Sequence, residues 1–310
     1  MQMNWDSAEI AFFVQAALDE DIGAGDLTAR AIVPAESRAR ARIIARRQVV
    51  VAGLPLAEKI FCALDPGARV GAGVAEGGDV QANTVLAHVE CRAQALLSGE
   101  RTALNLLGHL SGVATLTRQF VRAVAGTRTQ IRDTRKTLPL LRRLEKYAVQ
   151  MGGGVNHRMG LYDAMLIKEN HIAAAGSVRE AVRRARAFLP SPGGMAETTA
   201  YESFAPPDAR WDEAVPIEVE VRNEAELREA LGAGADSLLL DNTTPDEATR
   251  LVALARGLRS GCVLEISGGV TLENVRAYAA AGADYISVGA LTHSAPAADL
   301  SLLVESGPRL

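Results

Sequence analysis

Beyond Gly126 the chain alternates short apolar runs with segments of helical periodicity. The runs have the length and β-branched content of buried strands, and they cover residues 130–133, 164–167, 217–221, 237–240, 263–266 and 285–288. Helical stretches lie between several of them, at 140–150, 178–188, 224–230 and 272–281. Short apolar strands alternating with helices are typical of a parallel sheet that helices cover on both faces. This half of the chain is therefore predicted to be an α/β domain.

The first part of the chain has the mixed pattern of a small α+β domain. Residues 6–18 have the periodicity of an amphipathic helix, with Asp6 as its expected cap and Glu9 at the spacing of a capping box. Alternating or β-branched runs cover 40–51 and 85–91, with turn-forming residues between them. This arrangement predicts an antiparallel sheet.

A long helix, a long loop and a last strand complete the pattern. Residues 99–124 are predicted to form the helix, in which Gly108 and Gly112 indicate close packing or a kink. Residues 189–216 contain five prolines and few apolar positions, which predicts a long surface loop that is partly disordered. The apolar run at 299–304 predicts a final strand.

Polar or glycine residues stand at the end of each of the six apolar runs. In chain order they are Arg135 with Lys136, Lys168, Glu220, Asp241, Ser267 to Gly269, and Gly289 with Ala290. A (β/α) barrel places its active site at the carboxyl ends of its strands, whereas an open doubly wound sheet binds at one switch point. The pattern therefore favours a barrel, with fewer than eight clear strands.

Charge is distributed unevenly. The 310 residues have a formal net charge of −4, yet residues 131–172 carry eight Lys and Arg against four Asp and Glu. An acidic protein that concentrates cations beside glycine loops suits small anions better than a nucleic-acid duplex. Aromatic residues make up only 4% of the chain, which also disfavours a groove that stacks bases.

The cysteines and the apolar content indicate a cellular location. Cys62, Cys91 and Cys262 have no paired spacing, so neither a disulfide framework nor a zinc site is expected, and a reducing compartment is favoured. No apolar run reaches the roughly 18 residues that span a bilayer. The first residues do not resemble a signal peptide. We therefore expect a cytoplasmic protein with neither a membrane nor a nucleic acid as partner.

Two consecutive glycine turns are candidates for phosphate binding. They are the segments SGGVTLENV (267–275) and SVGALTH (287–293), each of which runs from a strand through glycine towards an expected helix. Backbone N–H groups and the helix dipole favour an anion at such a turn, and barrels often bind phosphate with their last two strand loops. A tight turn would be sufficient to explain either segment alone, but the consecutive pair favours phosphate.

Five cations near the strand ends are candidates for anion binding. Arginine matches a carboxylate with a planar fork, and lysine is a point charge suited to phosphate. In GGGVNHR (152–158) three glycines precede a His-Arg pair. Fixing three glycines costs conformational entropy, which a merely solvated surface would not offset. The candidates are Arg135, Lys136, His157, Arg158 and Lys168. The cations of the intervening helix, Arg142, Arg143 and Lys146, are interpreted as a solvated face.

Two acids end neighbouring strands. Glu220 and Asp241 offer the few oxygen ligands that suit Mg²⁺ shared with substrate oxygens, or they could bind sugar hydroxyls. A buried acid paired with a core cation is an equally good interpretation. Strand alternation places Glu218 on the same side as Glu220. Together, the phosphate turns, the cations and the acids imply transfer between a phosphorylated sugar and an anionic acceptor.

The chain also resembles the quinolinate phosphoribosyltransferases, the carboxylating nicotinate-nucleotide pyrophosphorylases. The resemblance covers nearly all of the chain except the segment 189–216, which is longer than the usual link of the family. Eight motifs carry it in order: ERTALNLLGHLSG (100–112), IRDTRKTLP (131–139), KYAVQMGGGVNHR (146–158), LIKENH (166–171), IEVEV (217–221), LLLDN (238–242), EISGGV (265–270) and VGALTH (288–293).

The resemblance implies a fold and an assembly. It implies a small N-terminal α/β sandwich domain (1–112), an incomplete, seven-stranded α/β barrel (113–292) and a C-terminal segment (293–310) that returns to the first domain. It also implies a homodimer in which Arg101 completes the site of the partner. The implied reaction transfers phosphoribosyl from phosphoribosyl pyrophosphate (PRPP) to quinolinate with decarboxylation, in NAD biosynthesis.

The resemblance further implies roles for single residues. Quinolinate would be bound by Arg135, His157, Arg158 and Lys168, with Thr134 and Arg101 also contacting substrate. The ribose and the Mg²⁺-pyrophosphate end of PRPP would be held by Lys136, Glu220 and Asp241, with the two acids as metal ligands. Lys168, Lys136, Glu220 and Asp241 would be catalytic, and Lys168 the most critical. The 5-phosphate would be bound by Ser267, Gly268, Gly269, Val288, Gly289, Ala290 and His293.

Other functions are compatible with parts of the pattern. A lysine at a barrel strand end, such as Lys168, is also typical of a Schiff-base aldolase. The many neighbouring charges, however, disfavour a desolvated, reactive lysine. A molybdate-associated relative of the same fold is a second alternative, although the NHR and IKENH motifs match the quinolinate enzymes. A non-catalytic anion-binding protein is the third.

Overall fold

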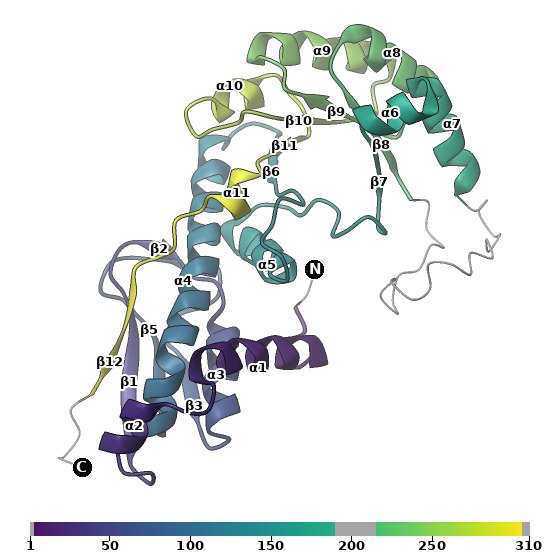
Figure 1. Cartoon of the computed structure of the whole chain (residues 1–310). Helices are drawn as coiled ribbons and strands as arrows, with labels where there is room; N and C mark the ends of the chain where they lie inside the picture. The colour runs from purple at the N-terminus through teal and green to yellow at the C-terminus, as the bar shows by residue number, and fades with distance from the viewer. Residues whose placement is uncertain (1–2, 190–214, 306–310) are drawn as a thin grey trace. The chain divides into compact units, whose positions relative to one another are not determined.

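The structure, a computed structural model, describes residues 3–189 and 215–305 (Figure 1). The chain divides into two compact units. The first comprises Met1–Arg118, Leu138–Gly154 and Ala290–Leu310, and the second comprises Gln119–Thr137 and Val155–Gly289. The loop predicted over 189–216 falls almost entirely outside the described residues.

A four-stranded antiparallel sheet is the centre of the first unit. Its order is β12 (Leu300–Val304), β1 (Arg38–Ala45), β5 (Val85–Arg92) and β3 (Arg69–Ala72). The short strands β2 (Val49–Val50) and β4 (Asp79–Val80) pair separately. The helices are α1 (Ala8–Ile22), α2 (Leu27–Ile32), α3 (Leu54–Leu64), most of α4 (Ala93–Ala123), α5 (Arg142–Gly152) and α11 (Ala290–His293). The predicted antiparallel sheet is therefore confirmed, although the sequence pattern did not reveal α3.

Two helix starts differ from the prediction. The cap of α1 is Ser7 and not Asp6, because the Ser7 hydroxyl accepts a hydrogen bond from the backbone N–H of Ile10, while Asp6 pairs with Lys59. Helix α4 begins at Ala93, six residues before the expected Gly99. Strand β5 leads directly into α4, so no turn residue marks the boundary in the sequence.

The glycines of α4 allow the C-terminal segment to pack closely. A Cβ atom on Gly112 would lie 2.1 Å from the carbonyl oxygen of Pro296, and one on Gly108 would lie 3.0 Å from that of Ala298. The backbone N–H of Ala298 donates to the carbonyl of Gly108 at 2.8 Å. The prediction of close packing at these two glycines is confirmed.

Asp65 at the end of α3 should make stability depend on pH. Its carboxylate, 5% exposed, accepts hydrogen bonds from the backbone N–H groups of Arg92 (2.8 Å) and Gly67 (3.0 Å), and the first of these is the main cause that lowers the pKa of Asp65 below 3.8. In Asp65→Asn the side-chain NH₂ replaces one of the two carboxylate oxygens, so one backbone N–H loses its acceptor. We therefore expect the free energy of unfolding at neutral pH to fall by about 1–3 kcal/mol.

A carboxyl group whose pKa is lower in the folded protein than in the unfolded chain stabilises the fold at pH values above its unfolded pKa. This contribution is lost as the pH falls through the folded pKa. The difference between wild type and Asp65→Asn should therefore shrink below pH 3.8. Urea unfolding of both proteins across this range measures it, with the exposed Asp299→Asn as the matched control. A difference that stays constant with pH would show that the Asp65 charge has no such role.

The second unit is built on a parallel sheet of six strands. Their order is β6 (Gln130–Arg132), β11 (Tyr285–Ser287), β10 (Val263–Ser267), β9 (Ser237–Asp241), β8 (Ile217–Val221) and β7 (Met165–Ile167). These are the six predicted runs, and every neighbouring pair is parallel. A single parallel bridge, from Arg132 to Val155, extends the sheet beyond β6. The described residues thus form an open α/β barrel of six strands and one bridge, where seven strands were expected.

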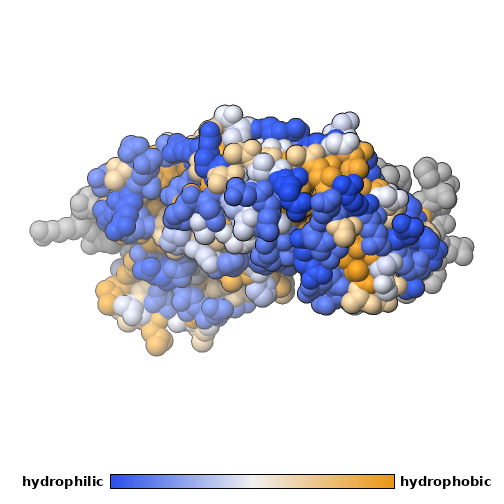
Figure 2. Space-filling view, turned by 90° about the horizontal axis from the view of Figure 1, so that it is seen from above, coloured by the Kyte–Doolittle hydropathy of each residue, from blue (hydrophilic) through white to orange (hydrophobic). Residues whose placement is uncertain are grey.

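Five of the described helices belong to this sheet, and Figure 1 shows α7 to α10 along its outer side. They are α6 (Glu169–Ala175), α7 (Val178–Phe188), α8 (Glu224–Gly232), α9 (Pro245–Leu258) and α10 (Val275–Ala280). Strand residues such as Ile217, Val219 and Leu240 are fully buried, and helices α7 and α8 pack against β8. None of the described helices is long and apolar enough to cross a membrane, and the face in Figure 2 is mostly hydrophilic with small apolar patches.

Candidate active site

Neighbouring strands of the parallel sheet end at one edge, where the candidate residues lie. Ser267 of β10 stands opposite Asp241 of β9 and Ser287 of β11. Glu220 of β8 stands opposite Leu239, two residues before Asp241. Because all these strands are parallel, their carboxyl ends bring side chains from distant parts of the sequence together.

Lys168 and the two strand-end acids form one charged cluster. Lys168 Nζ donates to Glu220 Oε2 at 2.7 Å. Burial raises the pKa of Asp241, and the Glu220 carboxylate raises it further, while Lys168 and Lys136 act in the opposite direction. Two cations and two anions therefore share this site. Lys168 Nζ is held by a carboxylate and is about half exposed, so it is not the desolvated, isolated amine that the Schiff-base alternative requires.

Local contacts position Lys168. It precedes α6 as the N-cap residue, and its backbone N–H donates to His171 Nδ1 at 3.0 Å. Its side chain is 48% exposed, whereas that of Glu220 is 11% exposed. The lysine thus projects from a fixed backbone and remains accessible to a substrate.

Arg135 and Arg158 form a pair of like charges with unused hydrogen-bond donors. Burial lowers the pKa of Arg158, and the neighbouring Arg135 guanidinium lowers it further. The Nε atoms of both arginines are buried and have no hydrogen-bond partner among the described residues. Arg158 Nη1 donates to the carbonyl of Ala164 at 2.9 Å, which fixes its side chain. Buried guanidinium donors without partners are costly, and an anion would satisfy them.

A second layer of charged residues lies two positions before Glu220 on β8 and two positions before Ser267 on β10. Glu218 is 6% exposed and Glu265 is fully buried. Arg132 Nη1 donates to Glu265 Oε2 at 2.6 Å, and the Ser287 hydroxyl donates to Oε1. His157 Nε2 lies 3.1 Å from Glu218 Oε2 and 3.6 Å from Glu265 Oε1. Burial raises the pKa of Glu265, and Glu218 raises it further.

This layer has the spacing of a metal site. His157, Glu218 and Glu265 offer ligand atoms within 4.8 Å of one another. The imidazole argues against a metal, because its Nδ1 accepts a hydrogen bond from the backbone N–H of Arg158 at 2.7 Å. An imidazole that binds a metal through Nε2 carries its proton on Nδ1, whereas Nδ1 of His157 faces a hydrogen-bond donor. Since Arg132 already supplies positive charge, the layer is a buried ion-pair network.

The first glycine turn requires its glycines. Gly268 and Gly269 have φ angles of +93° and +63°, and a Cβ atom on Gly268 would lie 2.3 Å from Asn242 Oδ1. The backbone N–H of Asn242 donates to the carbonyl of Ser267 at 2.9 Å. Helix α10 begins only at Val275, three residues later than predicted. Any anion affinity of this turn therefore comes from its N–H groups more than from the helix dipole.

Three predicted site residues belong to the first unit. Arg101 is exposed on α4. Because α4 starts at Ala93 and not at the predicted Gly99, Arg101 lies in its third turn and not in its first. Ala290 and His293 are the ends of α11, and His293 Nδ1 lies 2.6 Å from the hydroxyl of Ser294. Of the phosphate candidates, Val288 is buried and Gly289 is half-buried in the second unit.

Helix α5 corrects another prediction. Lys146 was assigned to a solvated face with Arg142 and Arg143, yet it is fully buried. Its neighbour Glu145 is also fully buried and lies 2.8 Å from His109 Nε2. The helix therefore presents a polar interior surface, which a rule that buries only apolar residues does not predict.

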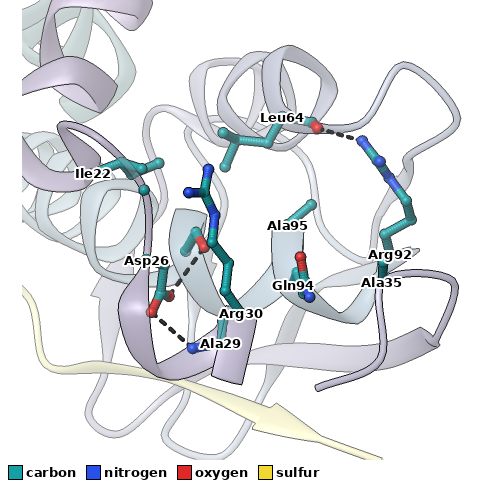
Figure 3. A pocket seen from close by; sticks show the side chains of 11 residues that line it. Ile22, Asp26, Ala29, Arg30, Ala35, Leu64, Arg92, Gln94 and Ala95 are labelled. Atoms are coloured by element: carbon teal, nitrogen blue, oxygen red, sulfur yellow. Dashed lines mark hydrogen bonds between the residues drawn. The ribbon is translucent and has the colours of Figure 1, made fainter. Parts of the chain in front are cut away.

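A pocket in the first unit contains none of the candidate residues (Figure 3). Asp26 accepts hydrogen bonds there from the backbone N–H of Ala29 (2.9 Å) and the Ser98 hydroxyl (3.0 Å). Arg30 donates to the carbonyl of Ala24 and Arg92 to that of Leu64. Its polar groups thus satisfy one another.

Sequence reasoning missed several residues that shape the site. Glu265 and Arg132 lie inside runs interpreted only as strands, and Asn242 was quoted in a motif without a role. Asp133 accepts a hydrogen bond from the backbone N–H of His157 at 2.8 Å and so positions the His-Arg pair. A charged residue inside an otherwise apolar strand, as in VLEIS (263–267), is the signal that could have identified the buried layer.

Comparison with known proteins assigns the chain to a family. The model of the quinolinate phosphoribosyl transferase N-terminal domain matches residues 26–111, and that of the C-terminal domain matches residues 113–303. A probable carboxylating nicotinate-nucleotide pyrophosphorylase of Bacillus subtilis is 42% identical over 283 residues, which cover 91% of this chain and 89% of the relative. The Mycobacterium leprae nicotinate-nucleotide pyrophosphorylase is 42% identical over 93% of this chain and 95% of the relative.

A solved structure agrees with the sequence relatives. The nicotinate-nucleotide pyrophosphorylase from Francisella tularensis superposes with a TM-score of 0.84 at 35% identity, over 98% of both chains. Two domain models in the right order, relatives matched over nearly their full length and a shared fold all point to one conclusion. The chain belongs to the quinolinate phosphoribosyltransferase family.

Proposed function

We propose that the chain transfers the phosphoribosyl group of PRPP to quinolinate with loss of CO₂, giving nicotinate mononucleotide and pyrophosphate in NAD biosynthesis. Family membership supports this reaction. The observation that carries the substrate assignment is the Arg135–Arg158 pair, whose buried Nε atoms have no partner among the described residues. A pyridine diacid would neutralise the two guanidinium groups and accept their hydrogen bonds. We place the reaction in the cytoplasm.

Quinolinate would be held by Arg135, Arg158 and Lys168, with Thr134 beside them. These groups would orient the ring nitrogen towards the anomeric carbon of PRPP. As the nitrogen donates its lone pair to that carbon, the bond to pyrophosphate breaks and the leaving group takes the electron pair. The positively charged ring then accepts the electrons of the bond to the 2-carboxylate as CO₂ departs, and the ring carbon takes up a proton. No side chain acts as a nucleophile.

PRPP would be held by the acids and the glycine turns. Glu220 and Asp241 fit a Mg²⁺ ion, since they are adjacent carboxylates whose repulsion contributes to the raised pKa of Asp241. When bound, this ion would neutralise charge on the departing pyrophosphate. Lys136 would contact the same end of PRPP. The 5-phosphate would be bound by Ser267, Gly268, Gly269, Val288, Gly289, Ala290 and His293.

The direct test is incubation of the purified protein with quinolinate, PRPP and Mg²⁺, followed by detection of nicotinate mononucleotide and CO₂. Formation of both in equal amounts supports the proposal. Nicotinate in place of quinolinate is the matched control, because it yields no CO₂. If neither product forms while the protein is folded, the proposed reaction is wrong.

We also propose a homodimer in which Arg101 completes the site of the partner subunit. The exposure of the Arg101 side chain supports this proposal. Mixtures of Arg101→Ala and Lys168→Ala subunits should then regain activity, because a mixed dimer contains one site without either substitution. Random mixing of equal amounts gives at most about a quarter of the wild-type activity. Turnover measured after subunit exchange tests this, and mixtures as inactive as their parents would rule out shared sites.

A further inference from the structure

A fully buried acid on α5 holds the chain segment that precedes the helix. Oε1 of Glu145 lies 2.8 Å from His109 Nε2, and Oε2 accepts the backbone N–H of Leu138 at 3.1 Å. A carboxylate away from water needs such partners, but buried charged pairs often add little or nothing to stability. The acid is therefore better explained by the groups that it holds in place.

The Leu138 N–H stands at the end of a segment whose backbone has no regular structure. The described residues 133–141 form neither helix nor strand. At the start of the segment, the N–H of Asp133 donates to the carbonyl of Val155 at 3.1 Å. Between Asp133 and Leu138 lie three of the proposed substrate contacts, Thr134, Arg135 and Lys136. The hydrogen bond from Leu138 to Glu145 thus fixes the segment at the end that leads into α5.

The turn from this segment into α5 has a strained backbone. Leu140 has a φ angle of +67°, and its side chain is 92% exposed. A bulky residue rarely adopts this left-handed conformation, which persists only where the surrounding contacts impose it. The exposed side chain makes little packing contact that could do so. The turn is instead closed by two hydrogen bonds, from the Leu141 N–H to the Leu138 carbonyl at 3.2 Å and from the Leu138 N–H to Glu145.

Helix α5 gives Glu145 a fixed position, because α4 holds the helix near both ends. Near the start of α5, His109 of α4 contacts Glu145 itself. At the other end, Arg118 Nε of α4 donates to the carbonyl of Gly152, the last residue of α5, at 2.8 Å. Gly152 lies so close to α4 that a Cβ atom on it would be 2.5 Å from Thr117 Cβ. Glu145 therefore projects from a helix with little freedom to move.

We infer that Glu145 is a positioning residue for the phosphoribosyl transfer, which sets where Arg135 and Lys136 meet the two substrates. The inference rests on the proposed function and adds to it a residue that touches neither substrate. Its effect passes through the chain, because Leu138 follows Lys136 closely in the sequence. A displacement of about 1 Å at a binding group can cost about 10²-fold in rate, so loss of the bond to Leu138 should be visible in turnover.

The kinetic test compares two substitutions of Glu145. Glu145→Leu keeps most of the volume but accepts no hydrogen bond. We expect its kcat/KM to fall about 10- to 100-fold for both quinolinate and PRPP, because the displaced segment contacts both. In Glu145→Gln the amide oxygen can still accept from Leu138 while the NH₂ donates to His109. This variant should retain both kcat/KM values within about threefold of wild type, because both contacts survive.

Asp65→Asn is the matched control, because Asp65 is another buried acid of the first unit that accepts backbone N–H groups. It should lower stability and leave both kcat/KM values unchanged. Hydrogen exchange on the folded proteins gives a readout that does not depend on turnover. The Leu138 amide should exchange faster in Glu145→Leu than in wild type, Glu145→Gln or Asp65→Asn.

A second pair of variants decides the question if Glu145→Leu does not fold. The His109 side chain is 22% exposed, so its replacement disturbs the core less. His109→Leu leaves the Glu145 carboxylate with one partner fewer, whereas His109→Gln supplies a new donor. Losses for both substrates should therefore appear in His109→Leu and largely disappear in His109→Gln.

The outcomes separate this inference from the proposed function. A folded wild type that does not turn over quinolinate overturns the function itself. With an active wild type, the positioning role alone is overturned by unchanged kcat/KM values in folded Glu145→Leu or, in its place, His109→Leu. A Leu138 amide that exchanges at the wild-type rate in Glu145→Leu, or a loss in Glu145→Gln as large as that in Glu145→Leu, overturns it as well.

Discussion

Lys168→Ala is expected to reduce kcat by about 10²–10³-fold or more, with the protein still folded. The amine donates to Glu220 at 2.7 Å within the cluster that also contains Asp241. In the proposed reaction Lys168 binds quinolinate beside the two acids assigned to PRPP, and a preorganised charge at a reacting centre is worth this much in catalysis. The fold should tolerate the change, because the side chain is about half exposed and exposed ion pairs contribute about 0–1 kcal/mol.

Steady-state turnover with both substrates saturating, together with thermal unfolding, measures the two effects. Lys168→Arg retains the charge but changes its geometry, and it should recover only part of the activity. The matched control is Arg250→Ala, which removes an exposed ion pair with Glu224 elsewhere in the same unit and should leave turnover unchanged. Activity near wild type in Lys168→Ala would remove this residue from the mechanism.

The parallel sheet could be predicted from the sequence because its signals are local. Runs such as IEVEV (217–221) are short, apolar and bounded by helical segments, and the structure places strands there within a residue or two. The polar residues that follow, such as Lys168 and Asp241, come together because the carboxyl ends of parallel strands share an edge. Candidate site residues at strand ends can therefore be predicted before the strand order is known.

The buried polar groups could not be predicted, because their burial depends on partners far away in sequence. Glu265 is surrounded by apolar neighbours in its strand, and only the approach of Arg132, 133 positions away, explains how it can be buried. Lys146 shows the same limit, since its helix pattern resembles a solvated face although the residue has no exposed surface. The start of α4 was misplaced for a local reason, since β5 continues into it without a turn.

Arg135→Ala should weaken use of quinolinate while sparing use of PRPP. The Nε atom of Arg135 is buried without a partner, beside an Arg158 whose pKa its charge helps to lower. Removing one partner of a buried, hydrogen-bonded charge pair costs about 2–5 kcal/mol. The expected loss in kcat/KM for quinolinate is therefore about 30- to 3,000-fold, at 1.4 kcal/mol per factor of ten. The KM for PRPP should change by less than about threefold.

Three measurements make this expectation specific to carboxylate recognition. Arg135→Lys keeps the charge but lacks the planar fork, so its loss should lie between those of wild type and Arg135→Ala. Arg143→Ala, on helix α5 of the first unit, removes an exposed arginine paired with Glu9 and should have no effect on either substrate. Since removal of Arg135 relieves the repulsion on Arg158, the folded protein should not lose stability. Equal losses for quinolinate and PRPP would mean that the pair does not bind the diacid.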